Sequence, residues 1–534
     1  MSLQSKNFNS AFGRILLSGV LLSFVAPGLR AGAQTPAASP TKDLWIGTYI
    51  NGKKAGYTSV STKSTQYGGK DATETLTHSL INLQMFGATV TQDVTQKTVS
   101  DAAGKPLLEV FDIASSGSAM HVDARYDYVA GEIICLVGKA PSLQTKTIKI
   151  PKGANLAGDT TFGVIGQPVV GQKYTYYALD PLSVRLQPST VQVIKKANTL
   201  DAISGKEVSA YVVKADTGSG VMTAWVQNAD SMVRAEIALG PVTMSMWNET
   251  KERALETDDA DPGAKLAANT NSANGSSNGK PKRYTPPADF AVATAMISNK
   301  TLPDPRRLHS LQVGIDGIPD RNLILSDARQ RVSNVRLSGH NRAFQANYDI
   351  EARPFNAEKS AQFPVSDAAL TPYLGGDAYL ETENPEIKAT ALKLRGQEMS
   401  LYTVAVKIRD WVSKSMTPDA SIGVPRSASD IYEKPRGVCR DYATLYTAIA
   451  RAAGIPTRLC AGIVYANGRF FYHAWAESYV GEWVTFDPTL YDSAHPVSYV
   501  DATHIKFAQG DVMQMFEVVA IVGRLHLTVQ KFAM

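Results

Sequence analysis

Three residues in the last fifth of the chain have the types and the order of a thiol-based catalytic triad. Cys439 is followed by His473 and then by Asp487. A cysteine becomes a strong nucleophile when a histidine takes its thiol proton. The histidine in turn needs a carboxylate that fixes its tautomer and stabilises its charged form. The three residues therefore predict covalent acyl-transfer chemistry, provided that the fold brings them together.

The residues that follow Cys439 predict a helix with the cysteine at its N-terminus. Gly454 ends this helix and Pro456 prevents its restart. At a helix N-terminus the unpaired backbone N–H groups and the helix dipole favour the thiolate, which is the reactive form. The apolar positions share the three- and four-residue spacing of one helical face and are Leu445, Tyr446, Ile449, Ala450 and Ala453.

The chain then changes to β-strand patterns. Residues 457–479 are rich in apolar and aromatic side chains, and Asn467-Gly468 divides them as a strong hairpin signal. A second turn lies near residues 480–482. If this turn is centred on Val480, His473 and Asp487 stand directly opposite each other, which is the closest side-chain pairing in an antiparallel ladder.

This stretch resembles the transglutaminase-like superfamily, whose fold is papain-like, over roughly residues 384–510. The resemblance implies that Cys439 is the nucleophile, that His473 is the general base and acid, and that Asp487 orients His473. The Cys439 backbone N–H is a natural oxyanion donor, and Tyr432 is the nearest preceding aromatic side chain that could assist it or simply pack. The residues that carry the resemblance are Gly437, Cys439, Asp441, Tyr442, Ala443, Leu445, Arg451, Ala452, Gly454, Ile455, Pro456, Arg458, Gly462, residues 473–477 and residues 487–489.

Each of the three residues also has a structural explanation. A single cysteine is usually a small buried hydrophobic residue, a histidine on an aromatic strand usually packs in a core, and an aspartate before proline usually stabilises a turn. Their joint occurrence in this order favours a triad. The alternative is a catalytically inactive transglutaminase-like binding or scaffold protein of the cell envelope. For His504, farther along the chain, we expect a structural role.

The first 33 residues predict a secretory signal peptide. Lys6 and Arg14 precede an apolar stretch, and Ala31-Gly32-Ala33 is a cleavage site after Ala33. The apolar stretch is short and is interrupted by Ser, Gly and Pro, so an uncleaved anchor is the weaker alternative. We therefore expect a periplasmic or secreted protein. No later stretch is long and apolar enough to predict a membrane span in the mature chain.

The charge balance and the cysteine content exclude several classes of function. The net charge is +5, and the signal peptide carries three of these charges at Lys6, Arg14 and Arg30, so nothing predicts nucleic-acid binding. No Cys or His pairs have zinc spacing and no acidic calcium loop occurs, so no metal or cofactor is expected. Cys135 and Cys460 either pair as a disulfide or are two buried thiols; their apolar strand patterns favour buried thiols.

The remaining chain predicts an α+β protein in which large antiparallel β domains precede a papain-like catalytic domain with helices packed on an antiparallel sheet. Residues 41–255 alternate with period two and have frequent turn signals, as in a large antiparallel sheet or half-open barrel. Residues 256–287 are a flexible linker rich in Asn, Ser, Gly and Ala. Residues 288–365 are a small β module, and residues 366–534 are the catalytic domain. Within it, the polar residues 413–436 are a candidate groove wall or lid.

We therefore expect an exported thiol enzyme that acts on peptide or amide bonds through a thioester intermediate. The triad is the same whether water or an amine accepts the acyl group. Hydrolysis, as in a peptidase or amidase, is favoured over protein crosslinking. The expected substrates are peptides or proteins, with cell-envelope components available in the expected compartment.

Overall fold

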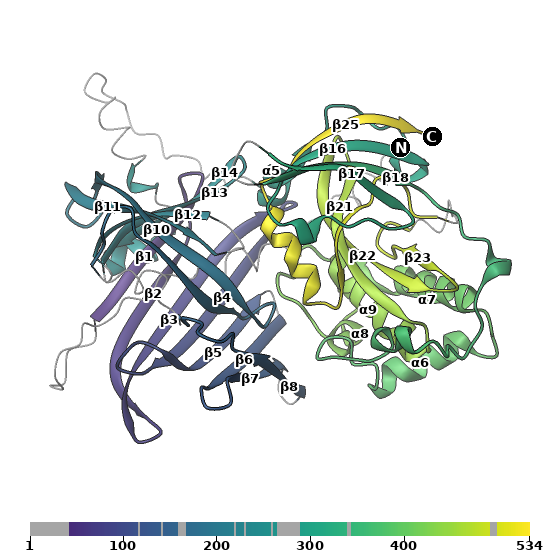
Figure 1. Cartoon of the computed structure of the whole chain (residues 1–534), viewed down its shortest axis with the longest axis horizontal. Coiled ribbons are helices and arrows are strands. Elements are labelled where there is room, and N and C mark those ends of the chain that lie inside the picture. The colour runs from purple at the N-terminus through teal and green to yellow at the C-terminus, as the bar shows by residue number, and fades with distance from the viewer. Residues whose placement is uncertain are drawn as a thin grey trace. The chain divides into compact units, whose positions relative to one another are not determined.

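The computed structural model describes residues 42–115, 118–139, 142–157, 167–217, 221–228, 231–257, 260–263, 289–338, 343–491 and 499–534. These residues divide into two compact units, one up to residue 293 and the other from residue 294 onward (Figure 1). The predicted signal peptide and most of the predicted linker lie outside the described residues. Among the described helices, none has both the length and the apolar character that crossing a bilayer requires.

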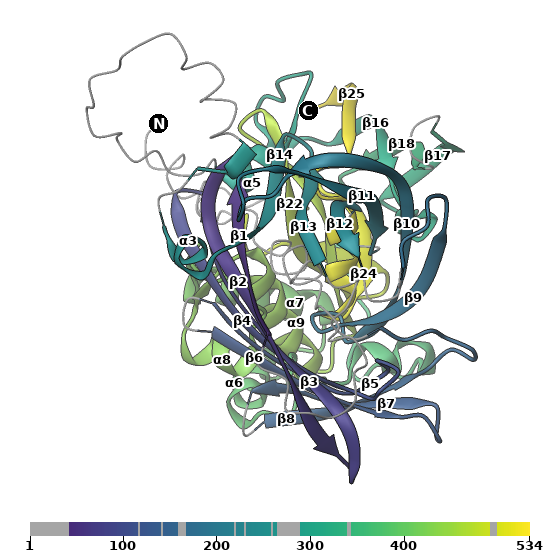
Figure 2. The ribbon, with the colours of Figure 1, turned by 90° about the vertical axis from the view of Figure 1, so that its left-hand side faces the viewer.

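The first unit is built on one fourteen-stranded antiparallel sheet, as the alternating sequence pattern predicted. Its order is β8-β7-β6-β5-β4-β3-β2-β1-β14-β13-β12-β11-β10-β9. Neighbouring strands are therefore consecutive in the sequence except for β1 and β14, whose pairing joins the run from β1 to β8 to the run from β9 to β14. Figure 2 shows that the sheet is strongly curved. The strands are β1 (Lys42–Ile50), β2 (Lys53–Tyr67), β3 (Lys70–Met85), β4 (Ala88–Ser100), β5 (Pro106–Ser115), β6 (Ser118–Asp127), β7 (Glu132–Lys139), β8 (Ser142–Lys149), β9 (Lys173–Asp180), β10 (Arg185–Leu200), β11 (Glu207–Asp216), β12 (Val221–Asn228), β13 (Ser231–Leu239) and β14 (Val242–Glu249).

Two short helices, α3 (Lys251–Leu255) and α5 (Phe290–Thr294), flank the segment in which the linker was predicted. The described part of that segment packs against the sheet, because Asp261 accepts a hydrogen bond from the indole Nε1 of Trp247 at 2.9 Å and also bonds Ser245. The predicted linker boundaries remain a prediction, since residues 264–288 are outside the described chain.

The second unit contains two antiparallel sheets and a group of helices (Figure 1). The first sheet has the order β15-β22-β21-β24, with β23 on the same edge of β22 as β15. The second has the order β17-β18-β16-β25, so the last strand of the chain pairs with residues of the predicted small β module. The strands are β15 (Met296–Ile297), β16 (Ser310–Ile318), β17 (Gln330–Leu337), β18 (Phe344–Glu351), β19 (Thr417–Pro418), β20 (Arg436–Gly437), β21 (Thr457–Ala466), β22 (Arg469–Tyr479), β23 (Trp483–Phe486), β24 (Ile505–Gly510) and β25 (His526–Ala533).

The first long helix of this unit begins and ends at the residues that the sequence signals indicated. The Asn384 side chain caps the first long helix by accepting hydrogen bonds from the N–H groups of Glu386 and Ile387, and Gly396 ends it with a positive φ of 54°. The α-helices are α6 (Pro385–Arg395), α7 (Leu401–Ser415), α8 (Ala428–Glu433) and α9 (Cys439–Ala452), and the 3-10 helices are η2 (Pro305–Arg307), η3 (Arg321–Leu323), η4 (Ala357–Lys359), η5 (Ala368–Tyr373) and η6 (Gln514–Ile521).

Helix α9 is the central element of the second unit. It contacts α6, α7 and α8 as well as the strands β21 and β22. Tyr446, from the middle of the helix, shares a hydrogen bond of 2.9 Å with Ser478 of β22. Every residue of α9 from Cys439 to Arg451 is buried, so the helix lies inside the unit rather than on its surface. The predicted fold class, helices packed on an antiparallel sheet after a large β region, is confirmed.

Candidate active site

Cys439 is the first residue of α9, where the sequence placed it. The turn before it is fixed by Asp441, whose Oδ2 accepts a hydrogen bond of 2.9 Å from the Val438 N–H. Gly437 leaves the space for this carboxylate, since a Cβ at that position would lie 2.4 Å from Asp441 Oδ2. The short parallel pair of β19 and β20 ends at Gly437 and delivers the chain to the helix.

Two buried guanidinium groups lie beside this helix N-terminus. Arg426 Nε and Arg440 Nη2 are 3.5 Å and 3.7 Å from Asp441 Oδ1, and Arg440 Nη2 also donates to the Val424 carbonyl at 2.5 Å. Burial lowers the pKa of Arg440, although the Asp441 carboxylate opposes this effect. Two guanidinium groups face one carboxylate, and the resulting surplus of positive charge favours a negative charge at the start of α9.

The segment that leads to Cys439 was a candidate lid in the sequence. In the structure it contains β19, α8 and β20, and its apolar side chains at Ile422 and Val424 are buried. Arg426 ties the middle of the segment to its C-terminal end by donating to the carbonyls of Lys434 and Arg436. Because of these contacts, residues 413–436 form a packed wall beside the N-terminus of α9 rather than an open loop.

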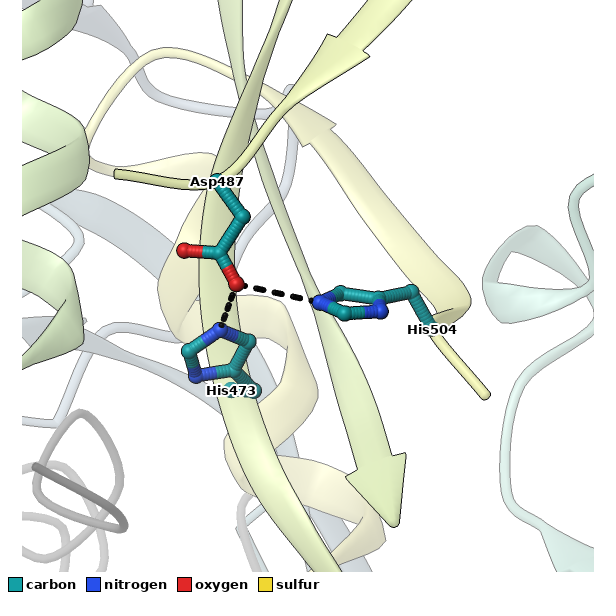
Figure 3. A group of neighbouring side chains, drawn as sticks. All are labelled: His473, Asp487 and His504. Carbon is teal, nitrogen blue, oxygen red and sulfur yellow. Dashed lines mark hydrogen bonds and ion pairs between the residues drawn. The ribbon is translucent and has the colours of Figure 1, made fainter. Parts of the chain in front are cut away.

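His473 and Asp487 form a buried hydrogen-bonded pair (Figure 3). His473 Nε2 donates to Asp487 Oδ2 at 2.8 Å, and the two residues are 1% and 4% exposed.

The predicted register between the strands that carry these two residues is wrong. Tyr479 pairs with Trp483 and Ala476 with Phe486, so the turn is centred on Gly481 rather than on Val480. Asp487 follows the end of β23 and reaches His473 along a diagonal of the strand pair.

The electrostatics of this pair follow from its burial and its partners. Burial alone would lower the pKa of His473, but the charges of Asp487 and Cys439, with side-chain hydrogen bonds from both, raise it to about 9. Burial likewise opposes ionisation of Asp487, but His473 and His504 hold the pKa of this carboxyl far below its usual range. The interaction with Cys439 also places the thiol beside His473. The structure thus brings together all three residues that the sequence selected.

A fourth residue joins this group, and the sequence reasoning assigned it only a structural role. His504 Nε2 donates to the same oxygen of Asp487 at 3.0 Å, and the rings of His473 and His504 are 5.6 Å apart (Figure 3). His504 stands directly before β24, which pairs with β21 on the other side from β22. The spacing of the sequence carried no signal for this contact, because it depends on the order of strands in the sheet.

His473, Asp487 and His504 also form a group that could hold a metal ion, since their ligand atoms lie within 4.8 Å of one another. The sequence spacing had shown no such group. Both Nε2 atoms point at one carboxylate oxygen at hydrogen-bonding distance. A metal bound through these two Nε2 atoms would require both of them to be deprotonated, so such binding and the observed hydrogen bonds exclude each other.

Two other features of this unit bear on the site. The Tyr432 hydroxyl shares a hydrogen bond of 2.9 Å with Thr390 Oγ1 and its ring stacks on Trp411, which agrees with a packing role rather than an oxyanion contact.

A pocket of about 350 Å³ lies along β22 and β23 and is lined by residues such as Arg353, Glu477 and Trp483. Its lining does not include Cys439 or His473.

Residues 388–488 match the family model of the transglutaminase-like superfamily. The resemblance predicted from the sequence is therefore confirmed for this stretch, which matches the transglutaminase-like superfamily. An uncharacterized protein of Mycobacterium leprae (strain TN) is 35% identical over 77 residues, which cover 12% of this chain and 27% of that protein. The match thus spans about a quarter of that curated relative.

Solved structures with similarity to the chain have low sequence identity. A candidate cysteine protease from Cytophaga hutchinsonii is 18% identical, with a TM-score of 0.31 over 42% of this chain and 89% of that chain. A beta-barrel-like protein of a domain of unknown function from Brucella abortus is 16% identical, with a TM-score of 0.30 over 40% of this chain and 97% of that chain. A candidate protease from Parabacteroides distasonis is 13% identical, with a TM-score of 0.18 over 76% of this chain and 68% of that chain.

Proposed function

We propose that the chain is an exported thiol enzyme that cleaves peptide or other amide bonds through a thioester intermediate. Cys439 is the nucleophile, His473 is the general base and acid, and Asp487 orients His473. The observation that carries the proposal is the buried hydrogen bond from His473 Nε2 to Asp487 Oδ2, with Cys439 at the helix N-terminus acting on the same histidine. A carboxylate bound to Nε2 leaves the Nδ1 lone pair as the acceptor for the thiol proton.

The reaction then follows in two halves. The Cys439 proton moves to His473, and the Cys439 sulfur attacks the carbonyl carbon of the amide. The C–N bond breaks as His473 returns the proton to the leaving nitrogen, and a thioester remains. In the second half His473 takes a proton from water, the resulting oxygen nucleophile attacks the thioester carbon, and the proton restores the thiol as the acid product leaves. The Cys439 backbone N–H is available for the oxyanion.

Protein crosslinking is the second candidate, and one observation favours it. The Cys439 side chain is fully buried, and His473 is nearly so. A transferase must keep water from the thioester until an amine arrives, which a closed site achieves. We favour hydrolysis because water reaches any site that opens to admit a peptide, whereas transfer to an amine also requires an access path for that amine and exclusion of water. Peptides and proteins of the cell envelope are the proposed substrates.

The first experiment compares the wild type with Cys439→Ala on a dansylated glutamine donor peptide, with and without an excess of a primary amine. Mass spectrometry reads the products. A backbone cut, or loss of ammonia without an adduct, supports the hydrolase. An amine adduct that forms only with the wild type identifies a transglutaminase.

The alternative, a catalytically inactive binding or scaffold protein, needs a separate test. An active enzyme that prefers another substrate would also give no product from this donor peptide. Iodoacetamide at neutral pH should label Cys439 faster than an ordinary exposed thiol, since a thiol–imidazole pair supplies thiolate. Slow labelling of Cys439, combined with no product from the donor peptide, would replace the enzyme by a binding or scaffold protein.

A further inference from the structure

We propose that His504 is a positioning residue of this site, which holds the Asp487 carboxylate in the orientation that serves His473. The proposal rests on the proposed function of the triad and extends it to a fourth residue. Its starting point is that one oxygen, Asp487 Oδ2, accepts hydrogen bonds from two imidazoles, at 2.8 Å from His473 and at 3.0 Å from His504 (Figure 3).

The Asp487 carboxylate needs such support because of where it stands. β23 ends at Phe486, so Asp487 lies beyond the ladder and has no cross-strand backbone partner in the β22–β23 register. Its Oδ1 accepts hydrogen bonds from the N–H groups of Thr489 and Leu490 at 2.9 Å and 3.3 Å, which fix this oxygen of the carboxylate. His504 fixes the other oxygen, Oδ2. Without it, Oδ2 would keep a single donor and the carboxylate could turn away from His473.

His504 can serve as an anchor because it is itself held on its other side. Its Nδ1 lies 3.3 Å from Asp501 Oδ2. Asp501 is in turn paired with Arg306 Nη1 at 2.9 Å and accepts the Thr503 N–H at 2.8 Å. The group His473–Asp487–His504–Asp501–Arg306 is therefore a continuous series of polar contacts, buried except at Arg306, whose side chain is 23% exposed. It connects the catalytic histidine to a cation on η2.

The backbone and the ring of His504 are fixed as well. Arg329 Nη1 donates to the His504 carbonyl at 3.0 Å, and the next residue, Ile505, pairs with Ile463 of β21. The Trp475 indole meets the His504 ring edge-on, with centroids 5.3 Å apart and an interplanar angle of 88°. These contacts leave the imidazole one orientation, with a nitrogen toward each carboxylate.

The titratable and charged groups around His504 agree with this positioning role. Those that face it are Asp487, Asp501 and His473, with Arg306 behind Asp501. Each ring nitrogen of His504 thus lies beside one carboxylate, Nε2 beside Asp487 and Nδ1 beside Asp501, and this arrangement sets the orientation of the ring.

The test measures the alkylation of Cys439 by iodoacetamide as a function of pH, in EDTA, with peptide mass spectrometry as the readout, and needs no substrate. The variants are His504→Leu, His504→Gln, Asp501→Asn and, as the reference for the triad, Asp487→Asn. The Gln amide retains a donor toward Asp487, whereas Leu does not. The matched controls are His121→Leu and Asp112→Asn, which break a solvent-accessible His–Asp pair in the other unit, with 2.7 Å between His121 Nδ1 and Asp112 Oδ1.

We expect His504→Leu to slow alkylation about tenfold near neutral pH and to move the midpoint of the pH profile upward by about one unit, because a misplaced Asp487 no longer stabilises the imidazolium that accompanies the thiolate. His504→Gln should recover most of the alkylation rate. The rate of Asp501→Asn should lie between those of the Leu and Gln variants, and the two controls should match the wild type.

Three outcomes would overturn the proposal, and each has a different consequence for the proposed function of the triad. If His504→Leu keeps the wild-type profile while Asp487→Asn does not, His504 is not a positioning residue and the triad stands. If Leu and Gln lose the rate equally and also expose Cys135 and Cys460 to the reagent, His504 acts on the fold alone. If Asp487→Asn itself leaves the profile unchanged, the proposed function fails together with this inference.

Discussion

Asp487 contacts His473 along a diagonal, two positions away from the residue that its strand register places opposite it. Extending the β22–β23 register beyond Phe486 sets Asp487 against Trp475, and the carboxylate crosses to His473 Nε2 at 2.8 Å. Diagonal neighbours on adjacent strands are within reach of long or ring side chains. The imidazole supplies this reach, so the pair forms although the two residues are not directly opposed.

Replacing the carboxylate of this pair should remove turnover while leaving the fold intact. Asp487→Asn keeps the size of the side chain but no longer selects the His473 tautomer. We expect the rate of product formation to fall by about three to four orders of magnitude. The measurement is turnover of a cleaved peptide, with circular dichroism to monitor the fold.

The control for this prediction is Asp112→Asn, the same substitution in an exposed His–Asp pair, whose carboxylate is 64% exposed. It should leave the rate unchanged. Near-wild-type turnover of the Asp487→Asn variant would mean that another group orients His473.

The raised pKa of His473 predicts a pH-dependent contribution to stability. Its pKa in the folded protein is about 9, above the ordinary value of 6.5, so the folded state holds a proton that the unfolded state releases. The stabilisation is complete below the unfolded pKa and is lost as the pH rises through about 9. It amounts to about 3 kcal/mol at most.

Urea unfolding of the wild type and of His473→Gln, from about pH 6 to about pH 10, checks this sign. The difference in the free energy of unfolding between the two proteins should shrink as the pH rises. His121→Gln, at an exposed position, should show no such trend. A difference that stays constant or grows with pH would contradict the assignment.

A buried charge network beside the site should be sensitive to the loss of any one member. Glu477 binds Lys506 Nζ at 2.7 Å and Arg458 Nη2 at 2.7 Å, and Lys506 Nζ also lies 2.6 Å from Asp327. Glu477→Gln leaves two buried cations with one carboxylate. We expect the free energy of unfolding to fall by about 3–5 kcal/mol, because breaking a buried pair strands the partner charge.

Chemical denaturation checks this value, and Glu383→Gln is the matched control. The Glu383–Lys388 pair has side chains that are 83% and 50% exposed. Its loss should cost less than about 1 kcal/mol. Equal effects of the two substitutions would show that the Glu477 network does not carry the stability assigned to it.

The three cysteines should differ in reactivity. All three are free thiols and all are buried. Burial raises the pKa of Cys135 to about 12 and raises the pKa of Cys460 well above its ordinary value, and neither has a histidine partner of the kind that Cys439 has in His473. At about pH 8, iodoacetamide should therefore label Cys439 alone in the folded protein, and all three thiols after unfolding in guanidinium.

A non-reducing digest completes this test. It should contain no peptide that links Cys135 to Cys460, in agreement with the buried-thiol interpretation of the sequence. A linked peptide would show that the two thiols oxidise to a disulfide. Labelling of Cys135 or Cys460 in the folded protein at the rate of Cys439 would remove the distinction between a reactive and a structural thiol.

Much of the local structure around the site could be predicted because its signals are short-range. Asn467 and Gly468 both adopt positive φ, 47° and 80°, and form the predicted two-residue turn between β21 and β22. Gly454 has a φ of 92° just after α9, as expected of a residue that ends a helix. These outcomes depend on backbone preferences within a few residues, which the sequence displays directly.

The register of the second turn could not be predicted in the same way. The Val480 N–H donates to the Glu482 carbonyl at 2.9 Å, and Gly481 at the centre has a φ of 122°. The sequence indicated a turn near residues 480–482, and the predicted register placed its centre on Val480. The choice between Val480 and Gly481 as the centre depends on how β23 packs against β22, and it moves the partner of every residue on β23.

By itself, the sequence selected the three residues of the proposed triad, the helix that begins at Cys439, the hairpin that carries His473 and the antiparallel character of the first unit. Residue types and local periodicity suffice for these. Only the tertiary structure decided that His504 shares the Asp487 carboxylate, that Asp501 and Arg306 stand behind it, and that β25 pairs with β16. The order of strands in a sheet makes such contacts, because it brings together residues that no local pattern in the chain connects.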